Sequence, residues 1–329
     1  MTKEHYLEEL KKLEPLIGNT PLVRLKSTKF NLYVKLESYN MTGSIKIRPA
    51  FNILKSAISN DIVTSDTTVI ESTSGNFGLG LATICRKLEI PFMPVIDPNI
   101  TESKERLLRI LASKVKKVTE MDETEGYLLN RIRFIKEYLN KNKNAFNPNQ
   151  YQNPDNYLAY YKTLGEEISN ELPKLDYVFI SVSSGGTVTG LSIKLKEMFK
   201  DVKIIAVDIE GSLIFSDKAM PRAIPGIGAS MRTDIIKNAH IDDHVILTHA
   251  EIIEGCHKLL SEQSIFAGGS SGAAYFAAQK FINKTNSNKD LNILFISPDG
   301  GNSYADTIYN DDWVNEKLKK EKQHGHEVF

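Results

Sequence analysis

The sequence predicts an α/β fold with two doubly wound domains, in which parallel sheets carry helices on both faces. From residue 61 onward, short β-branched runs alternate with amphipathic segments of helical period, as expected for parallel strands joined by helices. A segment rich in Asn, Pro and Gln at 147–156 interrupts this alternation and marks the expected hinge. With 329 residues and 41% hydrophobic side chains, the chain is long enough to bury two cores.

The elements before the hinge follow directly from this alternation. Each strand candidate is a short β-branched run, and each helix candidate repeats its apolar residues at helical spacing. The elements expected there are strand 67–71, helix 77–88, strand 91–96, helix 102–112, strand 114–119 and helix 123–140.

The elements after the hinge repeat the same pattern. We expect a smaller, mobile domain at 36–147 and a larger domain formed by 1–35 and 148–329. The tail after Asp312 is highly charged and is expected to be frayed. The expected elements are helix 157–171, strand 177–182, helix 187–199, strand 203–208, strand 244–248, helices 250–263 and 271–282, and strand 292–296.

The composition excludes several classes of partner. The 41 basic and 41 acidic side chains balance, and the lysine runs are interleaved with apolar or acidic residues, so no nucleic-acid partner is expected. No apolar run reaches membrane-spanning length and the N-terminus is polar, so we expect a cytoplasmic protein without a membrane partner. Cys85 and Cys256 lie in apolar helical patterns without metal-ligand spacing, and are predicted to be reduced core residues.

Glycine- and serine-rich turns follow three of the predicted strands, at 72–76, 183–187 and 298–301. In a parallel sheet such turns lie at the carboxyl ends of the strands, where ligands bind. The turn at 183–187 is the strongest phosphate candidate, because its glycines allow close approach and the helix that follows presents a positive dipole end. A fourth turn, at 268–272, has a similar donor-rich composition.

Lys46 is the candidate reactive residue. It follows Gly43 and Ser44 at the expected start of a helix, where its amine could lie in a pocket and form a Schiff base instead of being solvated at the surface. A phosphate nest together with a lysine is what pyridoxal phosphate requires.

Two nucleotide alternatives were weighed for the turn at 183–187. A Walker motif fails, because Leu191 and Ser192 follow Gly190 where lysine and a hydroxyl residue are needed. The glycine spacing also departs from the dinucleotide fingerprint, although Asp208 lies roughly where a ribose-binding acid would fall. Dinucleotide binding therefore stays open as the physical alternative.

Over residues 13 to about 313, the chain resembles the cysteine synthase (β-substituted alanine synthase) family of fold-type II pyridoxal phosphate enzymes, which share the tryptophan synthase β-like fold. Five motifs occur in the order typical of that family. They are Ile17-Gly18-Asn19-Thr20-Pro21-Leu22, Gly43-Ser44-Ile45-Lys46, Thr73-Ser74-Gly75-Asn76, Gly185-Gly186-Thr187 and Gly269-Ser270-Ser271-Gly272.

This resemblance implies a role for each motif. Lys46 would form the internal aldimine and move the α-proton, Asn76 would bind the phenolic oxygen, and Ser270 the pyridine nitrogen. Because a serine cannot stabilise a charged pyridinium, the ring would be a weaker electron sink and would favour elimination at Cβ. A homodimer is also expected. The implied cofactor-binding residues are Lys46, Asn76, Ser183, Ser184, Gly185, Gly186, Thr187 and Ser270, and the substrate-binding residues are Ser72, Thr73, Ser74, Gly75, Gln150, Tyr151, Ser183 and Gly228.

The second substrate is expected to be more polar than sulfide. Ordinary members carry phenylalanine after the glutamine and glycine then threonine at the start of the phosphate loop, whereas this chain has Tyr151, Ser183 and Ser184. Buried hydroxyls are costly unless a ligand pairs with them. The alternative is that the Tyr151 hydroxyl merely reaches water. Departures from the family are Met41, usually proline, and Ile47, usually aspartate; Arg232 is a weak candidate for a substrate phosphate.

Further segments resemble one subfamily, the synthases of siderophore biosynthesis that join O-phospho-L-serine and L-glutamate. The expected reaction is a β-replacement through an aminoacrylate, which gives N-(2-amino-2-carboxyethyl)-L-glutamate, a precursor of 2,3-diaminopropionate. The alternatives are cysteine synthase, using O-acetylserine or O-phosphoserine with sulfide, a cystathionine or lanthionine synthase, and a noncatalytic protein of the same fold. The segments are 207–215, 224–230, 265–270 and 309–313.

Overall fold

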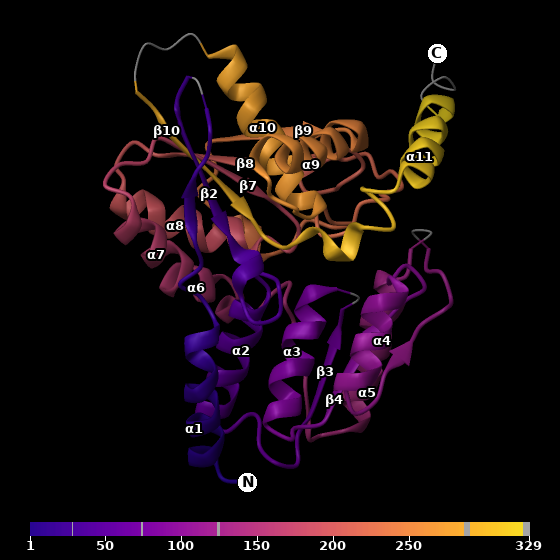
Figure 1. The fold of residues 1–329 in the computed structure, drawn as a ribbon. Helices are drawn as coiled ribbons and strands as arrows, with labels where there is room; N and C mark the ends of the chain where they lie inside the picture. Colours follow the sequence, from indigo (N-terminus) through magenta and orange to yellow (C-terminus); the bar gives the residue numbers. More distant parts are fainter. Residues whose placement is uncertain (28, 74, 124–125, 286–289, 325–329) are drawn as a thin grey trace. The chain divides into compact units, whose positions relative to one another are not determined.

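The computed structural model describes residues 1–27, 29–73, 75–123, 126–285 and 290–324, without side chains beyond residue 318. The chain forms two compact units, drawn in Figure 1. Unit 1 contains Met1–Gly18 and Asn40–Tyr160, and unit 2 contains Asn19–Tyr39 and Tyr161–Phe329. These bounds differ from the expected domains chiefly at the N-terminus. Met1–Gly18 belongs to unit 1 and not to the larger domain, because helix α1 packs on helix α2.

Unit 1 is built on a four-stranded parallel sheet in the order β5-β4-β3-β6. Alternate strand residues enter two cores on opposite faces of the sheet. Val69 and Phe92 belong to the core that contains helices α1, α2, α3 and α4, whereas Ile70 and Met93 face α5. The elements are α1 (Lys3–Leu13), η1 (Glu14–Leu16), α2 (Ile47–Ser59), β3 (Thr68–Ser72), α3 (Asn76–Lys87), β4 (Phe92–Ile96), α4 (Glu102–Leu111), β5 (Lys116–Lys117), α5 (Leu128–Lys141), β6 (Ala145–Phe146) and α6 (Pro154–Lys162).

Unit 2 is built on a six-stranded sheet in the order β1-β2-β10-β7-β8-β9, in which only β1 runs antiparallel to its neighbour. Its elements are β1 (Leu22–Arg24), β2 (Asn31–Leu36), η2 (Glu37–Tyr39), α7 (Leu164–Glu171), β7 (Tyr177–Ser181), α8 (Gly186–Met198), β8 (Lys203–Ile209), η3 (Ile235–Asn238), β9 (Asp243–Leu247), α9 (His249–Gln263), α10 (Gly269–Lys284), β10 (Asn292–Ser297), η4 (Gly301–Tyr304) and α11 (Asp311–His324).

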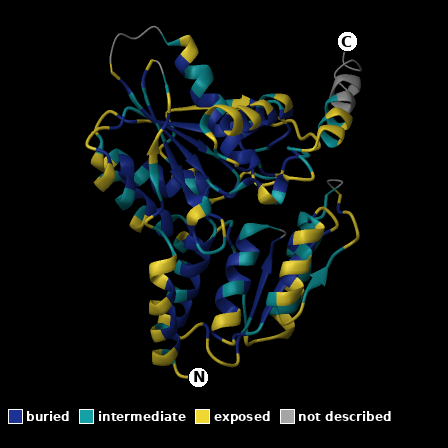
Figure 2. Ribbon diagram, viewed as in Figure 1, coloured by how far each residue is buried: buried dark blue, intermediate teal, exposed yellow. Residues whose placement is uncertain are grey.

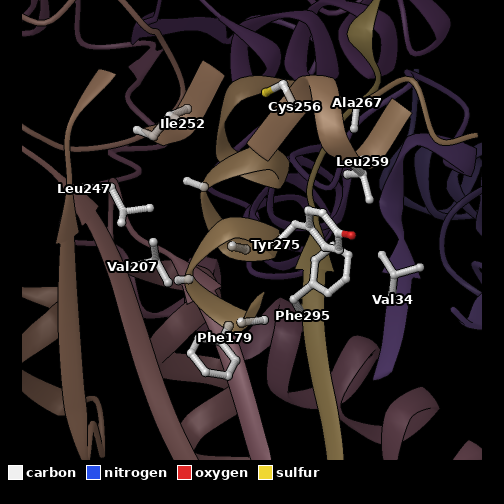
Figure 3. Close-up of a cluster of buried hydrophobic side chains, with 14 of the residues drawn as sticks. Val34, Phe179, Val207, Leu247, Ile252, Cys256, Leu259, Ala267, Tyr275 and Phe295 are labelled. Atoms are coloured by element: carbon white, nitrogen blue, oxygen red, sulfur yellow. The ribbon is translucent and has the colours of Figure 1, made fainter. Parts of the chain in front are cut away.

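The core of unit 2 lies between its sheet and the pair α9 and α10. Figure 3 shows Phe179, Val207 and Phe295 of the strands packing against side chains of these helices, including Leu259 and Tyr275. On the other face, α8 contacts β7 and packs beside α7. The central strands β2, β10, β7 and β8 are buried along most of their length, as the dark blue of Figure 2 shows, whereas the edge strands β1 and β9 are largely half-buried or exposed.

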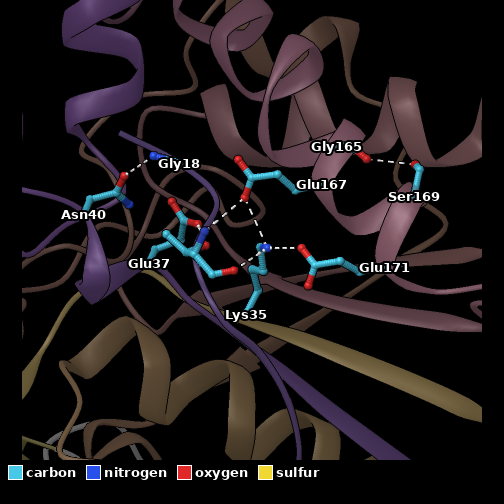
Figure 4. Close-up of polar contacts among 9 residues, drawn as sticks. Gly18, Lys35, Glu37, Asn40, Gly165, Glu167, Ser169 and Glu171 are labelled. Carbon is cyan, nitrogen blue, oxygen red and sulfur yellow. Dashed lines mark hydrogen bonds and ion pairs between the residues drawn. The ribbon is translucent and has the colours of Figure 1, made fainter. Parts of the chain in front are cut away.

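A buried lysine fixes the edge of this sheet. Lys35 of β2 is 0% exposed, and its Nζ lies 2.6 Å from the carbonyl of Thr20, 2.6 Å from Glu171 and 3.1 Å from Glu167, as Figure 4 shows. The Thr20 hydroxyl donates to buried Glu37 at 2.6 Å. The motif at residues 17–22 therefore ties β1 and β2 to α7.

Several expected elements need correction. Helix 157–171 is two helices separated at Thr163, β5 is only two residues long, and α5 begins at Leu128 instead of residue 123. Apart from the helix expected to start near Lys46, the elements before residue 61 were not anticipated, because their apolar residues are interrupted by glycines and charges.

Residues 311–324 form the helix α11, so the expectation of a frayed tail was wrong for this part of it; residues 325–329 lie outside the described residues. Asn310 caps α11 by accepting from the Trp313 N–H at 3.0 Å, and acidic residues stand in its first turn, where the helix dipole favours them. Trp313, Val314 and Leu318 pack against the core of unit 2. Because the segment is highly charged, its apolar face could not be recognised from the sequence.

Cys85 and Cys256 are free and buried, which confirms the prediction of reduced core thiols. In the described part of the chain, no helix has the length and apolar character needed to cross a membrane. Those same residues contain no cluster of His, Cys, Asp and Glu suited to a metal ion.

Candidate active site

Lys46 stands at the N-terminus of α2, as its sequence context predicts. Gly43 has a positive φ of 69°, and the turn that it closes brings the Gly43 N–H to 2.7 Å from the Asn40 carbonyl. The Ser44 hydroxyl then accepts from the Lys46 N–H at 3.3 Å. The glycine and the serine of the motif therefore set the backbone from which the half-buried Lys46 side chain extends.

Asn76 is positioned near this lysine by the packing of α2 on α3. At Gly80 of α3, an added Cβ would lie 3.1 Å from the Ala50 Cβ and 3.4 Å from the Lys46 carbonyl oxygen. A Cβ at 3.1 Å would be a tight contact, so the glycine lets the two helices approach closely without a shift of Ala50. Because Asn76 precedes Gly80 by four residues, both lie on the same face of α3, and Asn76 is therefore carried on the side of α3 that faces Lys46.

The loop at 72–76, the β3 loop, follows β3 and opens α3. The Thr73 hydroxyl accepts from the Gly78 N–H at 2.9 Å, which anchors the first turn of the helix. Gly75 is the N-cap and has no side chain with which to cap α3, and an added Cβ at Gly75 would meet nothing within 4 Å. The positive end of a helix dipole beside open space suits a carboxylate. Ser74 lies outside the described residues.

Gln150 reaches the end of β3 from the segment after β6. The side-chain amide of Gln150 lies 3.4 Å from the Ser72 carbonyl, and the backbone carbonyl of Gln150 accepts from the Asn156 side chain at 2.5 Å. The hydroxyl of Ser72 is buried without a hydrogen-bond partner among the described residues, so a ligand oxygen could still satisfy it. The structure thus brings Ser72 and Gln150 together, and half-buried Tyr151 follows on the same turn.

The loop at 183–187, the β7 loop, is held mainly by the backbone of unit 2. The Ser183 hydroxyl donates to the Gly228 carbonyl at 3.1 Å, and the Gly228 N–H donates to the Val182 carbonyl at 2.7 Å. The Thr233 hydroxyl donates to the Ser184 carbonyl at 2.9 Å. Ser183 and Gly228, both predicted substrate residues, are therefore neighbours.

The β7 loop fits a phosphate monoester. Gly185 adopts a φ of 89°, and a Cβ there would lie 3.1 Å from both the Ile236 Cβ and the Thr233 hydroxyl. It is the N-cap of α8, a helix of 13 residues whose N-terminus no described side chain caps, so the N–H groups of Gly186 and Thr187 face outward without that competition. Uncapped amides at the positive end of a helix dipole are the usual donors to a phosphate.

Ser270 lies in the first turn of α10 at the same edge of the sheet. Its carbonyl accepts from Ser181 at the end of β7 at 2.6 Å, which ties α10 to the strand that precedes the β7 loop. The neighbouring Ser271 is bonded to Ser297 at 3.0 Å. Ser270 is only 4% exposed and no bond of its hydroxyl occurs within the described residues, so that hydroxyl remains available to a ligand.

Other sequence candidates have structural roles. Arg232 donates to the Ile214 carbonyl at 2.9 Å. Asp208, the acid of the dinucleotide alternative, is 1% exposed; one oxygen accepts from the Ile209 N–H at 2.9 Å and burial raises the carboxyl pKa. In the turn after β10, Asp299 accepts from the Tyr304 hydroxyl at 2.9 Å and braces the loop that carries Ser270.

Two charged residues near these loops were missed. An added Cβ at Gly228 would lie 2.6 Å from an Arg222 Nη atom, and Arg222 also donates to Ser230 at 2.8 Å. Glu71, directly before Ser72, is buried beside the turn that carries Gln150. The only sequence signal for Arg222 was its position just before 224–230. The only signal for Glu71 was that it is an acid at the end of an expected strand.

The chain belongs to the pyridoxal-phosphate dependent enzyme family, whose family model matches residues 13–299. It is thus an enzyme that uses pyridoxal phosphate, and its chemistry is β-replacement. The donor-rich β7 loop and the lysine of α2 agree with this cofactor.

Named relatives cover nearly the whole chain. It is 35% identical over 309 residues to N-(2-amino-2-carboxyethyl)-L-glutamate synthase of Ralstonia nicotianae, across 92% of this chain and 91% of the relative. Among solved structures, O-acetylserine dependent cystathionine β-synthase from Helicobacter pylori has a TM-score of 0.83 at 30% identity, covering 90% of this chain and 98% of that one. These matches confirm the predicted fold class of fold-type II enzymes.

A further solved structure carries a reaction intermediate. A mutant of the hydrogen sulfide-producing enzyme from Fusobacterium nucleatum, complexed with an α-aminoacrylate intermediate, has a TM-score of 0.83 at 31% identity, with 91% of each chain covered.

Proposed function

We propose that this enzyme joins O-phospho-L-serine and L-glutamate into N-(2-amino-2-carboxyethyl)-L-glutamate, a precursor of 2,3-diaminopropionate. The observation that carries the proposal is the contact of Ser183 with Gly228, 3.1 Å from hydroxyl to carbonyl, which sets a polar side chain in the β7 loop. Sulfide needs no such polar side chain, whereas the amine of glutamate can donate to the Ser183 hydroxyl oxygen, whose own proton is directed at the Gly228 carbonyl. The name of the Ralstonia nicotianae relative, N-(2-amino-2-carboxyethyl)-L-glutamate synthase, supports the same product.

The residues of unit 1 are proposed to bind the amino acid and to move its α-proton. Lys46 takes the proton from Cα and later returns it. Ser72, Thr73, Gly75 and Gln150, together with the N-terminus of α3, hold the substrate α-carboxylate. Ser74 belongs to the same proposed set on its sequence alone.

The cofactor is proposed to be held by residues named from the sequence. Ser183, Ser184, Gly185, Gly186 and Thr187 bind its phosphate, Asn76 its phenolic oxygen, Ser270 its ring nitrogen, and Lys46 its aldehyde carbon. When bound, pyridoxal phosphate supplies an electron sink for bond changes at Cα and Cβ. The neutral Ser270 hydroxyl keeps that sink weak.

Atoms balance in the net reaction. The bond between Cβ and the phosphate oxygen of O-phosphoserine breaks, and inorganic phosphate leaves with the bonding electrons. The glutamate amine then forms the new bond to Cβ and loses one proton, while the α-proton removed at Cα is restored. We propose that Tyr151, Ser183 and Gly228 contact the incoming nucleophile.

Two alternatives remain within β-replacement. Cysteine synthase would use sulfide, and a cystathionine or lanthionine synthase would use a thiol amino acid; the Helicobacter pylori relative, an O-acetylserine dependent cystathionine β-synthase, favours the second. A homodimer and a cytoplasmic location stay predictions from the sequence.

Product analysis tests the proposal directly. Protein loaded with pyridoxal phosphate is incubated with O-phosphoserine or O-acetylserine, each paired with glutamate, sulfide, cysteine or homocysteine, and products are identified by mass. We expect the glutamate adduct to form fastest from O-phosphoserine. Faster reaction of sulfide than of any amino acid would replace the proposal with cysteine synthase. A Lys46→Ala control identifies any adduct that forms without the enzyme.

A further inference from the structure

Glu71 is a buried acid directly behind the β3 loop. It belongs to β3, which lies between β4 and β6, and the next residue is Ser72. Its side chain is among the least accessible in unit 1, with 1% of the residue exposed. An acid in such a place is costly unless its oxygens are hydrogen-bonded, so its partners indicate what it organises.

Those partners lie in the turn at 147–150. The Asn147 side-chain amide donates to the Ile70 carbonyl at 2.7 Å and to the Glu71 carboxyl at 3.1 Å. Backbone N–H groups of Asn149, Ser72 and Gln150 also hydrogen-bond to this carboxyl. The turn has a positive φ of 48° at Asn149, a conformation that asparagine tolerates better than most residues with a side chain. In this turn the donors gather at the Glu71 carboxyl.

From this geometry we propose that Glu71 is a positioning residue, which holds the 147–150 turn and thereby sets Gln150 against Ser72 for the substrate α-carboxylate. The link is the bond from the Gln150 amide to the Ser72 carbonyl at 3.4 Å. Asn156 secures the other side of the turn by donating to the Gln150 carbonyl. This inference rests on the carboxylate-binding role given to Ser72 and Gln150 in the proposed function.

The protonation of Glu71 matters because its neighbour would be an anion. Burial raises the pKa of the Glu71 carboxyl to about 8, against the opposing effect of its backbone donors and of Arg131 on α5. Arg131 is itself paired with Asp97, which follows β4, at 3.2 Å, and the 147–150 turn contributes only amides. At neutral pH, Glu71 is therefore largely uncharged, and no negative charge stands behind the carboxylate subsite.

Three variants test the proposal. Glu71→Gln keeps the shape and stays neutral, Glu71→Ala removes the oxygens, and Glu37→Gln changes a matched carboxyl of unit 2, 0% exposed and bonded to Thr20 at 2.6 Å. For each, kcat and KM for O-phosphoserine are measured by phosphate release between pH 6.5 and 9.5. Binding of the amino acid is followed separately by cofactor absorbance, and hydrogen exchange is measured over residues 145–152.

In the parent, KM for O-phosphoserine should rise above pH 8, by up to about tenfold per pH unit. In Glu71→Gln this rise of KM should be absent, because glutamine does not titrate. Glu71→Ala should raise KM at least ~10-fold, leave kcat within ~3-fold and speed exchange at residues 149–150. Glu37→Gln should follow the parent. Parallel profiles for the parent and Glu71→Gln, or a Glu71→Ala variant that lowers only kcat, would overturn the proposal.

The design separates this inference from the proposed reaction. If the parent uses O-acetylserine and sulfide, the proposed substrates are wrong, yet the same KM comparison applies to O-acetylserine because it carries the same α-carboxylate. If the parent uses O-phosphoserine and glutamate but Glu71→Ala binds the amino acid as well as the parent does, only the role of Glu71 fails.

Discussion

The β3 loop and the β7 loop have similar compositions, but different contacts hold them. The β7 loop is held by the Ser183 hydroxyl on the Gly228 carbonyl at 3.1 Å, by the Thr233 hydroxyl on the Ser184 carbonyl at 2.9 Å, and by the positive φ of Gly185. The β3 loop is held by the Thr73 N–H on the Val95 carbonyl at 3.1 Å and, at Ser72, by the side-chain amide of Gln150 at 3.4 Å. A glycine conformation can be recognised locally in a sequence, whereas side-chain support arriving from 78 residues away cannot.

The two loops also differ in the space they leave. An added Cβ would meet atoms at 3.1 Å at Gly185 but none within 4 Å at Gly75. The β7 loop is therefore already packed around its backbone donors, as expected for a group bound throughout the cycle. The open side of the β3 loop is better suited to a ligand that enters and leaves at each turnover.

The largest expected effect lies outside both loops. Lys46→Ala should abolish turnover while cofactor binding persists, because the β7 loop can still hold the phosphate. The purified parent should be yellow, and the variant should lose that covalent absorption but still retain pyridoxal phosphate on gel filtration. Lys55→Ala, on the same helix but 44% exposed and paired with Glu14, is the matched control and should remain active. A colourless parent that does not change with added cofactor would contradict the whole assignment.

Alanine at the two glycines should separate the loops. Gly185→Ala places a side chain at a positive φ and in a crowded position. It should lower the free energy of unfolding by ~1–3 kcal/mol and weaken pyridoxal phosphate affinity. Gly75→Ala should leave the unfolding temperature and cofactor affinity unchanged but raise KM for the amino acid, because its methyl group occupies the open space. Cofactor titration and substrate kinetics on both variants distinguish the effects. Equal loss of cofactor affinity in both would remove the distinction drawn between the loops.

A smaller effect is expected at the nucleophile step. Tyr151→Phe and Ser183→Gly should release phosphate from O-phosphoserine nearly as fast as the parent in a single turnover without glutamate. The activation free energy of transfer to glutamate should rise by about 1–3 kcal/mol for each hydrogen bond removed. Tyr161→Phe, which loses a hydroxyl bonded to Glu197 at 2.8 Å on an exposed surface, serves as control. Unchanged transfer in both variants argues for sulfide as the nucleophile.

A further effect concerns stability and pH. The Glu71 pKa is raised from 4.5 to about 8, so the native state binds more protons than the unfolded chain within this range. The stability contributed by protonated Glu71 is complete below pH 4.5 and falls as pH rises through about 8. Thermal unfolding midpoints measured from pH 5 to 9 should therefore decline less in Glu71→Gln than in the parent. Identical slopes would mean that Glu71 does not titrate in this range.

The predictability of the site follows the same division. Glycine- and serine-rich turns after strands are readable without a structure, and so is a lysine behind Gly43 and Ser44. β4 was readable because it is a continuous apolar run, and β3 because it begins with the β-branched residues Thr68, Val69 and Ile70. By contrast, the role of Glu71 depends on Asn147, 76 residues later, and the role of Thr20 on Lys35 and Glu37, so no local pattern reveals them.

Helix ends and termini show the complementary limit. The charged sequence of α11 favours a frayed tail, yet three apolar side chains dock on the core of unit 2. Local propensity cannot report such docking, since the energy comes from tertiary burial. The break in helix 157–171 at Thr163 likewise has no strong breaker in the sequence.

The buried thiols have a practical consequence for measuring motion. Burial raises the pKa of Cys256 to about 12 and that of Cys85 still further, so neither offers a thiolate to an alkylating dye. New cysteines at exposed Lys11 and Lys200, one on each unit, could therefore be labelled without removing the native pair. Energy transfer between two dyes would then report the distance between the units in solution, with and without an amino-acid substrate.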